Sequence, residues 1–587
     1  MSKMADVNTN LGTTLKVTVT GGGPVGLSFA LLLESLMGSK VAIKVYDGRW
    51  TQEGARIVWK GEEQENARRQ QVVTIQSRQY LRLPKEVRDR VFQEGCYSEM
   101  WPKGPDSIRG YGPRNVRIAH FEDKLLELAN EKKESIQLIP LRFDPEDRRD
   151  EIKSQHALVI CEGAQSYTRD YFAEKFGSAD KSMYSLEGDH VQDVILGLRV
   201  KSDLPDPMAV LLTVTQNRFL LNSLRGDGFL NMRLTDEEVE EVFGIDLKSK
   251  KFRDCIQSSP CVMEHTEKPG EFKSTTYSTL FLPAMLREGS PLWTRIQGGL
   301  KLFQIKEENL SAVTAFRLAM VHRPRFTAQV HPPTQKTPGT FGFLLGDAAN
   351  AIHFWPGRGL NSGIASAISL ARCLKLNWRD KGFREADFTR HEGLMAMLQY
   401  RHKSRAWRTM VTTDSNGNPC AIKNKIKQGI VESENGKFNK DSDIDELMSR
   451  LSQIRSRLKQ RISGLPSDNT LRQHLRELDP QTLRTLVVSG SWDTFSVGGE
   501  EVEVDLLFSD PDSVGGEEVD VDLLFSDPDL PVPPERKQAG KVLAGLTARI
   551  LVGVALAVGL YYLIPTLGGE LSDSLHNIID ELLVQVM

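Results

Sequence analysis

The feature that most constrains this sequence is a glycine-rich turn between a strand and a helix. Residues 15–20 alternate as a short buried strand does, and residues 27–36 form an apolar run of helical character. The turn between them follows the pattern GxGxxG, in which the glycines permit a tight reversal, a close approach to a pyrophosphate, and packing of helix on strand. The pattern predicts that phosphates bind at the helix N-terminus, through Gly21, Gly23, Pro24, Val25 and Gly26.

A second strand, residues 41–46, ends at an acid that completes this motif. Asp47 lies 21 residues after Gly26, where a carboxylate accepts hydrogen bonds from the ribose of a dinucleotide. A lone GxGxxG turn also occurs in other α/β proteins. Strand, helix, second strand and terminal acid together predict dinucleotide binding, and Arg49 is included in the predicted site.

A second strand–turn–helix motif lies late in the chain. Residues 341–345 read as a strand, Gly346 and Asp347 as its turn, and residues 356–363 open a helix of small residues that is expected to reach about Leu374. Asp347 can accept hydrogen bonds from polyol hydroxyls. A helix that begins near Gly359 directs its positive end at a ligand. Such a helix N-terminus stabilises the negative charge that a reduced flavin carries.

These motifs resemble the three fingerprints of group A FAD-dependent aromatic hydroxylases, whose prototype is para-hydroxybenzoate hydroxylase. The middle fingerprint corresponds to the turn at Glu162 and Gly163, where the family usually has Asp in place of Glu162. The resemblance covers residues 15–373. Residues 354–356, and Arg117 before a leucine-rich helix over 121–129, also look like the actin-oxidising flavoprotein monooxygenases of the same fold.

The resemblance implies a bound FAD and assigns residues to its parts. The glycine turn would hold the pyrophosphate and Asp47 the ribose, while Arg68 or Arg69 and Arg117 would lie near the adenosine diphosphate. Asp347 would bind the ribityl chain. The isoalloxazine would lie over Gly359, Leu360 and Asn361.

The family's activity is the hydroxylation or epoxidation of a small organic molecule. The resemblance implies that NAD(P)H reduces FAD, that O2 forms a C4a-hydroperoxide, and that oxygen passes to an aromatic or lipophilic substrate. Because there is one GxGxxG turn, NAD(P)H is expected to visit only transiently. The candidate catalytic residues are His353, Trp355 and Arg358. For His353 and Trp355, packing is the alternative role.

Two other functions stay open. One is a different flavin-dependent oxidoreductase, such as a halogenase, an ene-reductase or an enzyme that oxidises a protein side chain. The other is a degenerate flavoprotein that serves as a membrane-tethered scaffold.

The expected fold class is α/β, with a Rossmann-like FAD-binding domain over 14–190 and 331–411. An antiparallel β-sheet substrate domain over 191–330 interrupts it, because runs such as 209–214 and 229–234 alternate. A helical extension follows over 412–490. Its apolar spacing, behind a predicted capping box of Asp443 and Glu446, favours docking on the catalytic domain over pairing with another chain, through Ile444, Leu447, Leu451, Ile454, Leu458 and Ile462.

The remaining segments are predicted from composition. Residues 1–13 read as a flexible N-terminus and 491–540 as an acidic linker, in which residues 496–512 recur as 513–529 with one difference. These 34 residues hold twelve acids and no Lys or Arg, which favours a disordered tether over a motif that binds a protein partner.

The end of the chain predicts a membrane anchor. Residues 550–567 carry no charge, so 541–569 is expected to form a membrane-spanning helix, with 570–587 as an amphipathic tail. Basic residues before the anchor would leave the catalytic domain in the cytosol.

Composition also excludes some classes. The net charge is −3 without a strong basic block, so nucleic-acid binding is not expected. Six scattered cysteines form no metal-ligand pattern and indicate reduced thiols.

Overall fold

The computed structural model describes most of the first 491 residues. The described ranges are 14–61, 64, 66, 68–99, 112–180, 185–186, 189–239, 263–265, 272–274, 280–281, 291–318, 320–351, 353, 359–379, 382–414, 416–459, 462–491, 496–497 and 500–501. All of them belong to the first of two compact units of the chain, Met1–Val514; the second is Gly515–Met587.

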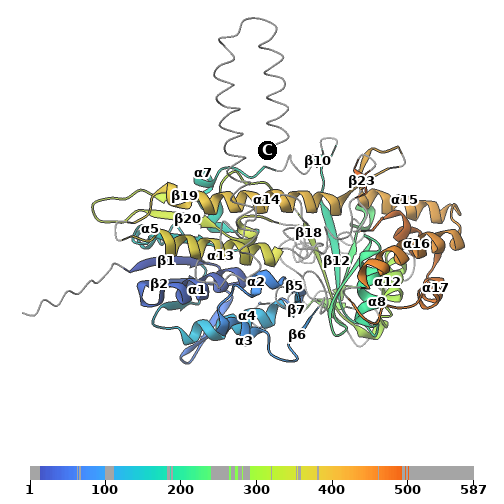
Figure 1. Cartoon of the computed structure of the whole chain (residues 1–587), viewed down its shortest axis with the longest axis horizontal. Coiled ribbons are helices and arrows are strands. Elements are labelled where there is room, and N and C mark those ends of the chain that lie inside the picture. Colours follow the sequence, from blue (N-terminus) through green and yellow to red (C-terminus); the bar gives the residue numbers. More distant parts are fainter. Residues whose placement is uncertain are drawn as a thin grey trace, which may run out of the picture. The chain divides into compact units, whose positions relative to one another are not determined.

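A six-stranded sheet forms the first core (Figure 1). Its order is β19-β20-β9-β1-β2-β8, and neighbouring strands are parallel except for β19, which is antiparallel to β20. The strands are β1 (Leu15–Thr20), β2 (Val41–Tyr46), β8 (Ile136–Ile139), β9 (Ala157–Ile160), β19 (Thr327–His331) and β20 (Thr340–Leu344). The sheet is thus the mixed, largely parallel sheet of an α/β protein, as predicted.

The carboxyl ends of four parallel strands form one row. Thr20 lies opposite Tyr46 on one side and opposite Ile160 on the other, and Ile160 lies opposite Leu344. The turns that follow β2, β1, β9 and β20 therefore come side by side along one edge of the sheet.

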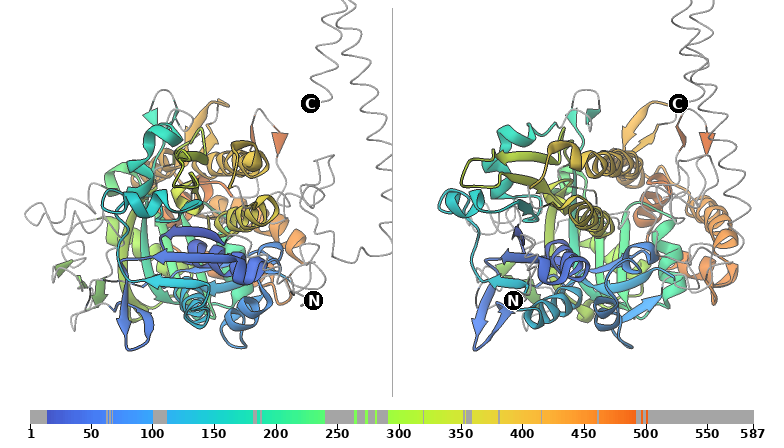
Figure 2. Two further views of the ribbon diagram at one scale, coloured as in Figure 1. Left: turned by 90° about the vertical axis from the view of Figure 1, so that its left-hand side faces the viewer. Right: turned by 60° about the vertical axis from the view of Figure 1, so that its left-hand side comes forward.

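Helices cover both faces of this sheet. Alternate strand residues fall into two buried clusters: Val159 packs with α1, α4 and α13, whereas Leu158 and Ile160 pack with α5, α7 and α14. In Figure 2, α13 and α14 lie side by side. The helices are α1 (Pro24–Met37), α4 (Ile118–Glu131), α5 (Arg149–Lys153), α6 (Tyr167–Tyr171), α7 (Ala173–Phe176), α13 (Gly359–Asn377) and α14 (Thr389–Met410).

Shorter elements connect these layers. They are η1 (Gly38–Lys40), β3 (Trp50–Glu53), β4 (Arg56–Trp59), β5 (Val72–Ile75), α2 (Ser77–Tyr80), α3 (Lys85–Val91), β6 (Tyr97–Glu99), β7 (Arg114–Arg117), η5 (Gly346–Ala348) and η6 (Glu385–Phe388). β3 pairs with β4, and β5, β7 and β6 form a three-stranded antiparallel sheet.

The second core is built on an antiparallel sheet, which confirms the expectation for the middle of the chain. Its order is β13-β14-β12-β18, with β12 (Asp193–Lys201), β13 (Phe219–Leu224), β14 (Asp227–Arg233) and β18 (Leu310–Leu318). Alternate residues of β12, such as Leu196 and Leu198, are buried against α12 (Pro291–Leu302) and the C-terminal helices.

One predicted strand of this region is wrong. Residues 209–214 belong to α8 (Asp206–Val214). Pro207 lies in its first turn, where the fixed φ of proline favours a helix start. Met208, Leu211 and Leu212 recur at helical spacing and are all buried, so the apolar run serves a helix that packs on the sheet rather than another strand.

The C-terminal helices complete the second core, as the predicted docking requires. They are α15 (Ile422–Glu434), α16 (Lys440–Leu458), α17 (Asp468–Arg476) and α18 (Pro480–Val488). The predicted apolar positions of α16 are buried in the same cluster as β12 and β14. The predicted capping box is wrong, because α16 begins earlier: Asn439 accepts hydrogen bonds from the amides of Asp441 and Ser442, and Asp443 pairs with Arg484.

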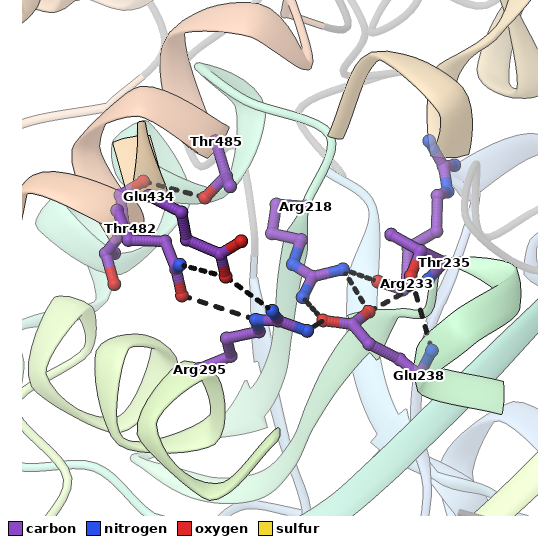
Figure 3. A network of polar contacts seen from close by, with 9 residues as sticks. Arg218, Arg233, Thr235, Glu238, Arg295, Glu434, Thr482 and Thr485 are labelled. Carbon is purple, nitrogen blue, oxygen red and sulfur yellow. Dashed lines mark hydrogen bonds and ion pairs between the residues drawn. The ribbon is translucent and has the colours of Figure 1, made fainter. Parts of the chain in front are cut away.

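A buried ion cluster joins the antiparallel sheet to these helices (Figure 3). The Glu238 carboxylate lies against both Nη atoms of Arg218, at 2.5 and 2.9 Å, and is 3.2 Å from Nη1 of Arg295. Arg295 of α12 also reaches Gln481 and Glu434. Sheet, α12, α15 and α18 are thereby connected through charged and polar groups.

Small pairs of strands complete the described elements. They are β10 (Ser185–Leu186) with β11 (Asp189–His190), β15 (Met263–His265), β16 (Phe272–Ser274) and β17 (Leu280–Phe281) together, β21 (Val411–Thr413) with β22 (Pro419–Ala421), and β23 (Ser496–Val497) with β24 (Glu500–Glu501). η4 is Glu307–Asn309. The β23–β24 pair lies within the predicted linker, four residues of which are thus paired strands.

The predicted N-terminal segment 1–13, the second repeat, the anchor 541–569 and the tail 570–587 lie outside the described residues. Within the part of the chain that the structure describes, no helix combines the length and hydropathy needed to cross a bilayer.

Candidate functional site

The glycine turn has the geometry that its sequence predicts. Gly21 adopts φ +94°, and a Cβ there would lie 2.5 Å from the Cys161 carbonyl oxygen. A Cβ on Gly26 would lie 2.1 Å from the Gly21 oxygen. Gly23 is different, because a Cβ there would meet only Nη2 of Arg49, at 3.4 Å. The first and third glycines are therefore needed for packing, and the second borders space.

The N-terminus of α1 is left without a side-chain cap. Gly23 is the N-cap residue and Pro24 follows at the first helical position. The first amides of a helix have no intrahelical acceptor, so the N–H groups of this turn are available to an anion beside Gly23.

Val25 joins this helix to the second predicted motif. A Cβ on Gly363 would lie 2.4 Å from Cγ2 of Val25, and one on Gly346 would lie 3.1 Å from the same atom. Gly346, at φ +59°, and Gly363 near the start of α13 thus close around the first turn of α1. Two motifs more than 300 residues apart in the sequence meet at one place.

Asp47 follows β2 as predicted, but its carboxylate is already occupied. Oδ1 accepts hydrogen bonds from the amide and Nε of Arg49, at 2.8 and 3.0 Å. Oδ2 accepts from the amide of Gly22 at 2.9 Å and from Nη2 of Arg49 at 2.6 Å. Burial lowers the pKa of Arg49, and the hydrogen bond and charge of Asp47 outweigh this and raise it. The predicted ribose acceptor is therefore covered by a neighbouring cation.

Glu122 lies on the far side of that cation. This residue of α4 is 1% exposed, its Oε1 is 3.7 Å from Nη1 of Arg49, and its Oε2 is 3.5 Å from Nη2 of Arg68. Burial raises the pKa of Glu122, against the charges of Arg69, Arg49 and Arg68. Its Oε1 accepts no hydrogen bond from any described residue.

Trp59 supports the two arginines. The guanidinium carbon of Arg49 lies 5.0 Å from the centre of the Trp59 ring, and that of Arg68 lies 4.4 Å from it. Trp50 packs edge-on against Trp59 and also fills the space beside Gly22, where a Cβ would lie 2.0 Å from its ring. An aromatic pair thus forms the floor beneath the arginines and the turn.

Arg69 is the exposed cation of this region. Its side chain makes no hydrogen bond or ion pair with a described residue, while its charge opposes the rise in pKa that burial causes in both Glu122 and Asp347. Its charge therefore acts on acids of both predicted motifs.

Asp347 lies beside the start of α13. A Cβ on Gly359 would be 3.9 Å from its Oδ1. The side chain is exposed, and yet surrounding protein raises its pKa, with Arg69 opposing the shift. Neighbouring protein thus disfavours the charged form of this carboxylate even though part of its surface is accessible.

Asn361 and Leu360 hold α13 in place. The Asn361 amide accepts a hydrogen bond from the Gln76 amide and donates one to the Thr74 carbonyl, both at 2.8 Å. Leu360 packs against the first core. In this structure the Asn361 side chain is directed at β5.

Arg117 departs from the prediction. Its guanidinium donates to the carbonyls of Gln70 and Asp227, each at 3.1 Å, and pairs with the Asp227 carboxylate at 2.7 Å. It joins β7 to β14 of the antiparallel sheet instead of facing the glycine turn. The acid that holds it is 110 residues away and could not be chosen from sequence.

The middle turn is closed by its own side chains. Glu162 accepts hydrogen bonds from the Ser166 hydroxyl and from the amide and hydroxyl of Thr168, at 2.6, 2.9 and 2.7 Å. Behind it, buried Arg169 donates to the carbonyls of Ala164 and Ala348. This turn therefore supports the residue next to Asp347.

His353 is buried rather than presented to a ligand. Its Nε2 is 2.8 Å from Oδ2 of Asp193, which is also 3.1 Å from Nε of Arg233. Burial lowers the pKa of His353, and the hydrogen bond and charge of Asp193 oppose the shift. The predicted catalytic role becomes a structural one here, because the ring has no exposed surface. The other two catalytic candidates, Trp355 and Arg358, lie outside the described residues.

Comparisons with known proteins give a likeness of fold. No family model and no curated protein sequence matches the chain. The similar solved structures include 2,6-dihydroxypyridine-3-hydroxylase from Arthrobacter nicotinovorans, at 14% identity and TM-score 0.40, covering 68% of this chain and 93% of that one. Another is 2-methyl-3-hydroxypyridine-5-carboxylic acid oxygenase, at 14% and 0.38, covering 68% and 89%. A third is the Diels-Alderase PyrE3 of pyrroindomycin biosynthesis, at 13% and 0.39, covering 67% and 72%.

The residues present fit a dinucleotide in part. The amides of α1 are uncapped, Arg69 is an exposed cation, and Asp347 lies exposed beside the start of α13. Asp47 and the space over Gly23 are both covered by Arg49, so neither can take the ligand without a movement of that side chain. Among the described residues, no cluster of His, Cys, Asp and Glu is arranged to hold a metal ion.

Glu122 was not among the predicted site residues. Its signal was present, because Glu122 lies on the apolar face of α4 with Leu125, Leu126 and Ala129, where an acid is out of place. An acid on such a face is buried, and a buried acid needs a cation. Asp193 and Arg233 gave no comparable signal, since their partners come from distant segments.

Proposed function

We propose that this chain is an FAD-dependent monooxygenase that uses NAD(P)H and O2 to hydroxylate or epoxidise a small aromatic or lipophilic molecule. The observation that carries the proposal is the row of turns at the carboxyl edge of the sheet. Asp47, the glycine turn and the Gly346–Asp347 turn follow strands whose last residues are in register. With about 4.8 Å between strands, β2 and β20 are about 14 Å apart, a span suited to an extended dinucleotide.

The residues divide the binding between them. The uncapped amides of α1 and the Arg69 guanidinium bind the two phosphates. Asp347 accepts hydrogen bonds from the polyol, which stabilise a carboxylate that surrounding protein would otherwise make less acidic. The N-terminus of α13 directs its positive end at the ring system.

When bound, the flavin supplies the two-electron redox chemistry that joins NAD(P)H to O2. The chain supplies a wall that excludes water from the small-molecule substrate. We assign this wall to the face of the antiparallel sheet opposite its core, where Ile195, Asn231 and Phe229 alternate with core residues of β12 and β14. Arg117 and Asp227 fix this sheet to the nucleotide-binding part.

The test begins with the absorbance spectrum of the purified protein, followed by NADPH and NADH oxidation under air. Flavin bands are expected, with slow oxidation of one nicotinamide that rises when an aromatic or lipophilic compound is added. Asp347→Ala should remove the flavin bands. Asp150→Ala is the matched control, because that carboxylate is 99% exposed on α5 and pairs with Lys153 at the surface. Full flavin content in D347A would refute the site.

A second candidate is the membrane-tethered scaffold, and the observation that favours it is the occupied Asp47. A degenerate site would keep its acid paired with Arg49 permanently. Purified protein that lacks flavin and takes up none from added FAD would establish this candidate in place of the first.

We also propose that residues 541–569 anchor the chain in a membrane with the catalytic part in the cytosol. The support is the uncharged run 550–567 and the basic residues before it.

A further inference from the structure

The Arg49 side chain donates as many hydrogen bonds to Asp47 as a ribose diol could donate. A carboxylate offers about four acceptor positions, and all four on Asp47 are used: two by the backbone amides of Gly22 and Arg49, and two by the Arg49 side chain. A ribose diol brings two donors. The ligand would therefore need only the two positions that the Arg49 side chain holds, while both backbone bonds remain.

Arg49 also stands where the phosphates would enter. Apart from the two neighbouring residues in the chain, its Nη2 is the one described atom within 4 Å of a Cβ built on Gly23. The Arg49 side chain is 36% exposed, so it can leave Asp47 without opening the core. In this structure a single guanidinium covers both the ribose acceptor and the space over the turn.

Glu122 offers that guanidinium a second partner. Its Oε1 has no hydrogen-bond donor within reach in the described chain, and Nη1 of Arg49 is already 3.7 Å away. The carboxylate is 1% exposed, and a buried acceptor without a donor is unstable relative to one that is paired. Arg68 does not fill the position, because its closest acid is Asp123, at 2.7 Å.

The path between the two acids is short and supported. The Arg49 guanidinium lies over the Trp59 ring, whose other contacts with Trp50 and Arg68 hold it in place. A planar cation keeps its attraction to an aromatic face while it shifts along that face. Movement from Asp47 to Glu122 thus needs no rearrangement of the floor.

We propose that Arg49 is a latch with two positions: it closes Asp47 in the ligand-free chain and moves to Glu122 when the ribose of the dinucleotide takes Asp47. Glu122 is then a positioning residue for cofactor binding, which acts through Arg49. In the exchange Asp47 gives up two hydrogen bonds from Arg49 and accepts two from the ribose, and Oε1 of Glu122 gains the guanidinium. The inference rests on the proposed function, because it takes FAD as the ligand.

The test measures FAD binding to the flavin-free full chain by quenching of flavin fluorescence. E122Q should raise the dissociation constant of FAD about tenfold, as the loss of a charge-assisted hydrogen bond predicts. In the R49M background E122Q should change it less than about twofold, since the cation that Glu122 would receive is gone. R49M alone should increase the association rate constant several-fold.

Glu127→Gln is the matched control. Glu127 lies on α4 as Glu122 does, carries the same charge and is 45% exposed, with Lys124 as its partner at 2.9 Å. This variant should leave the dissociation constant of FAD within about twofold of the wild-type value. R49K keeps the counter-charge on Asp47 but not the forked donor, so it should fold as the wild type does, with faster association and a smaller effect of E122Q.

A second measurement needs no bound cofactor. In the flavin-free chain R49M should lower the melting temperature, because Asp47 loses its counter-charge, and D47N/R49M should restore most of the loss.

The outcomes separate this inference from the proposed function. A wild-type chain that binds no FAD refutes both, whether or not the melting experiment shows that Asp47 and Arg49 are coupled. A chain that binds FAD while E122Q has the same effect with and without Arg49 refutes only the exchange. So does an R49M variant whose association rate is unchanged or slower.

Discussion

Removing the charge of Glu238 should loosen the contact between the antiparallel sheet and the C-terminal helices. The carboxylate is fully buried, and it accepts hydrogen bonds from both Nη atoms of Arg218, from Arg295 and from the amide of Thr235 (Figure 3). Glu238→Gln keeps the shape but places an amide donor against the donors of the arginines. Arg218, 1% exposed, is left without its counter-charge.

The size of the effect follows from this burial. Removal of one partner of a buried ion pair costs about 3–5 kcal/mol. At about 1.4 kcal/mol for each factor of ten, the population of the open state of this region should rise by about 100-fold or more. Because the described part of the chain is built around two cores, a local measurement is preferable to a single unfolding midpoint.

Hydrogen–deuterium exchange with mass spectrometry is such a measurement. Peptides that cover β13 and α18 should lose protection in E238Q, while peptides of β1 and β2 keep it. Glu237→Gln is the matched control, because Glu237 is 49% exposed and its ion pair with Lys427 is at the surface. The control should change the opening free energy by less than about 0.5 kcal/mol.

The stabilisation by the Glu238 carboxylate should be lost at low pH. Burial raises the pKa of Glu238, but the charge and hydrogen bonds of Arg218, with the charge of Arg295, outweigh it and lower the pKa. The stabilisation is therefore present above the pKa of an unfolded glutamate, about 4.3, and is lost as pH falls through the lower, folded value. The difference in exchange protection between wild type and E238Q is expected to be large at pH 7 and to narrow below about pH 4. Equal protection of wild type and E238Q at pH 7 would refute the reasoning.

Two further variants test other parts of the structure. Gly26→Ala places a Cβ 2.1 Å from the Gly21 oxygen and should lower the melting temperature and the flavin content together. Its control is Gly393→Ala, in open space on α14, which should be neutral or stabilise the helix by up to about 1 kcal/mol. Equal behaviour of the two variants would contradict the packing role of Gly26. A chain that lacks residues 544–587 should stay in solution without detergent and keep its FAD, since the described cores end before that segment; aggregation without flavin would show that the tail belongs to the fold.

Several local elements followed from the sequence because their causes are local. The strands 15–20 and 41–46 form as predicted, and Gly21 adopts the positive φ that only glycine takes readily. The helix from Gly359 and the apolar face of α16 also form, because helical spacing of apolar residues identifies a buried face wherever it occurs. Residues 209–214 show the limit, since a short apolar run suits a buried strand or a buried helix equally.

By itself the sequence determined where the glycine turn, the acid after β2 and the Gly346–Asp347 turn stand along the chain, and hence that they share one edge of a parallel sheet. Only the tertiary structure decided which partner each charged side chain has: Arg49 covers Asp47, Arg117 reaches Asp227, and His353 is buried on Asp193. The physical reason is that backbone conformation depends on neighbours in sequence, whereas an ion pair depends on distance and burial. Asp227 and Asp193 are 110 and 160 residues from their partners, and only the packing of two cores brings them within 3 Å.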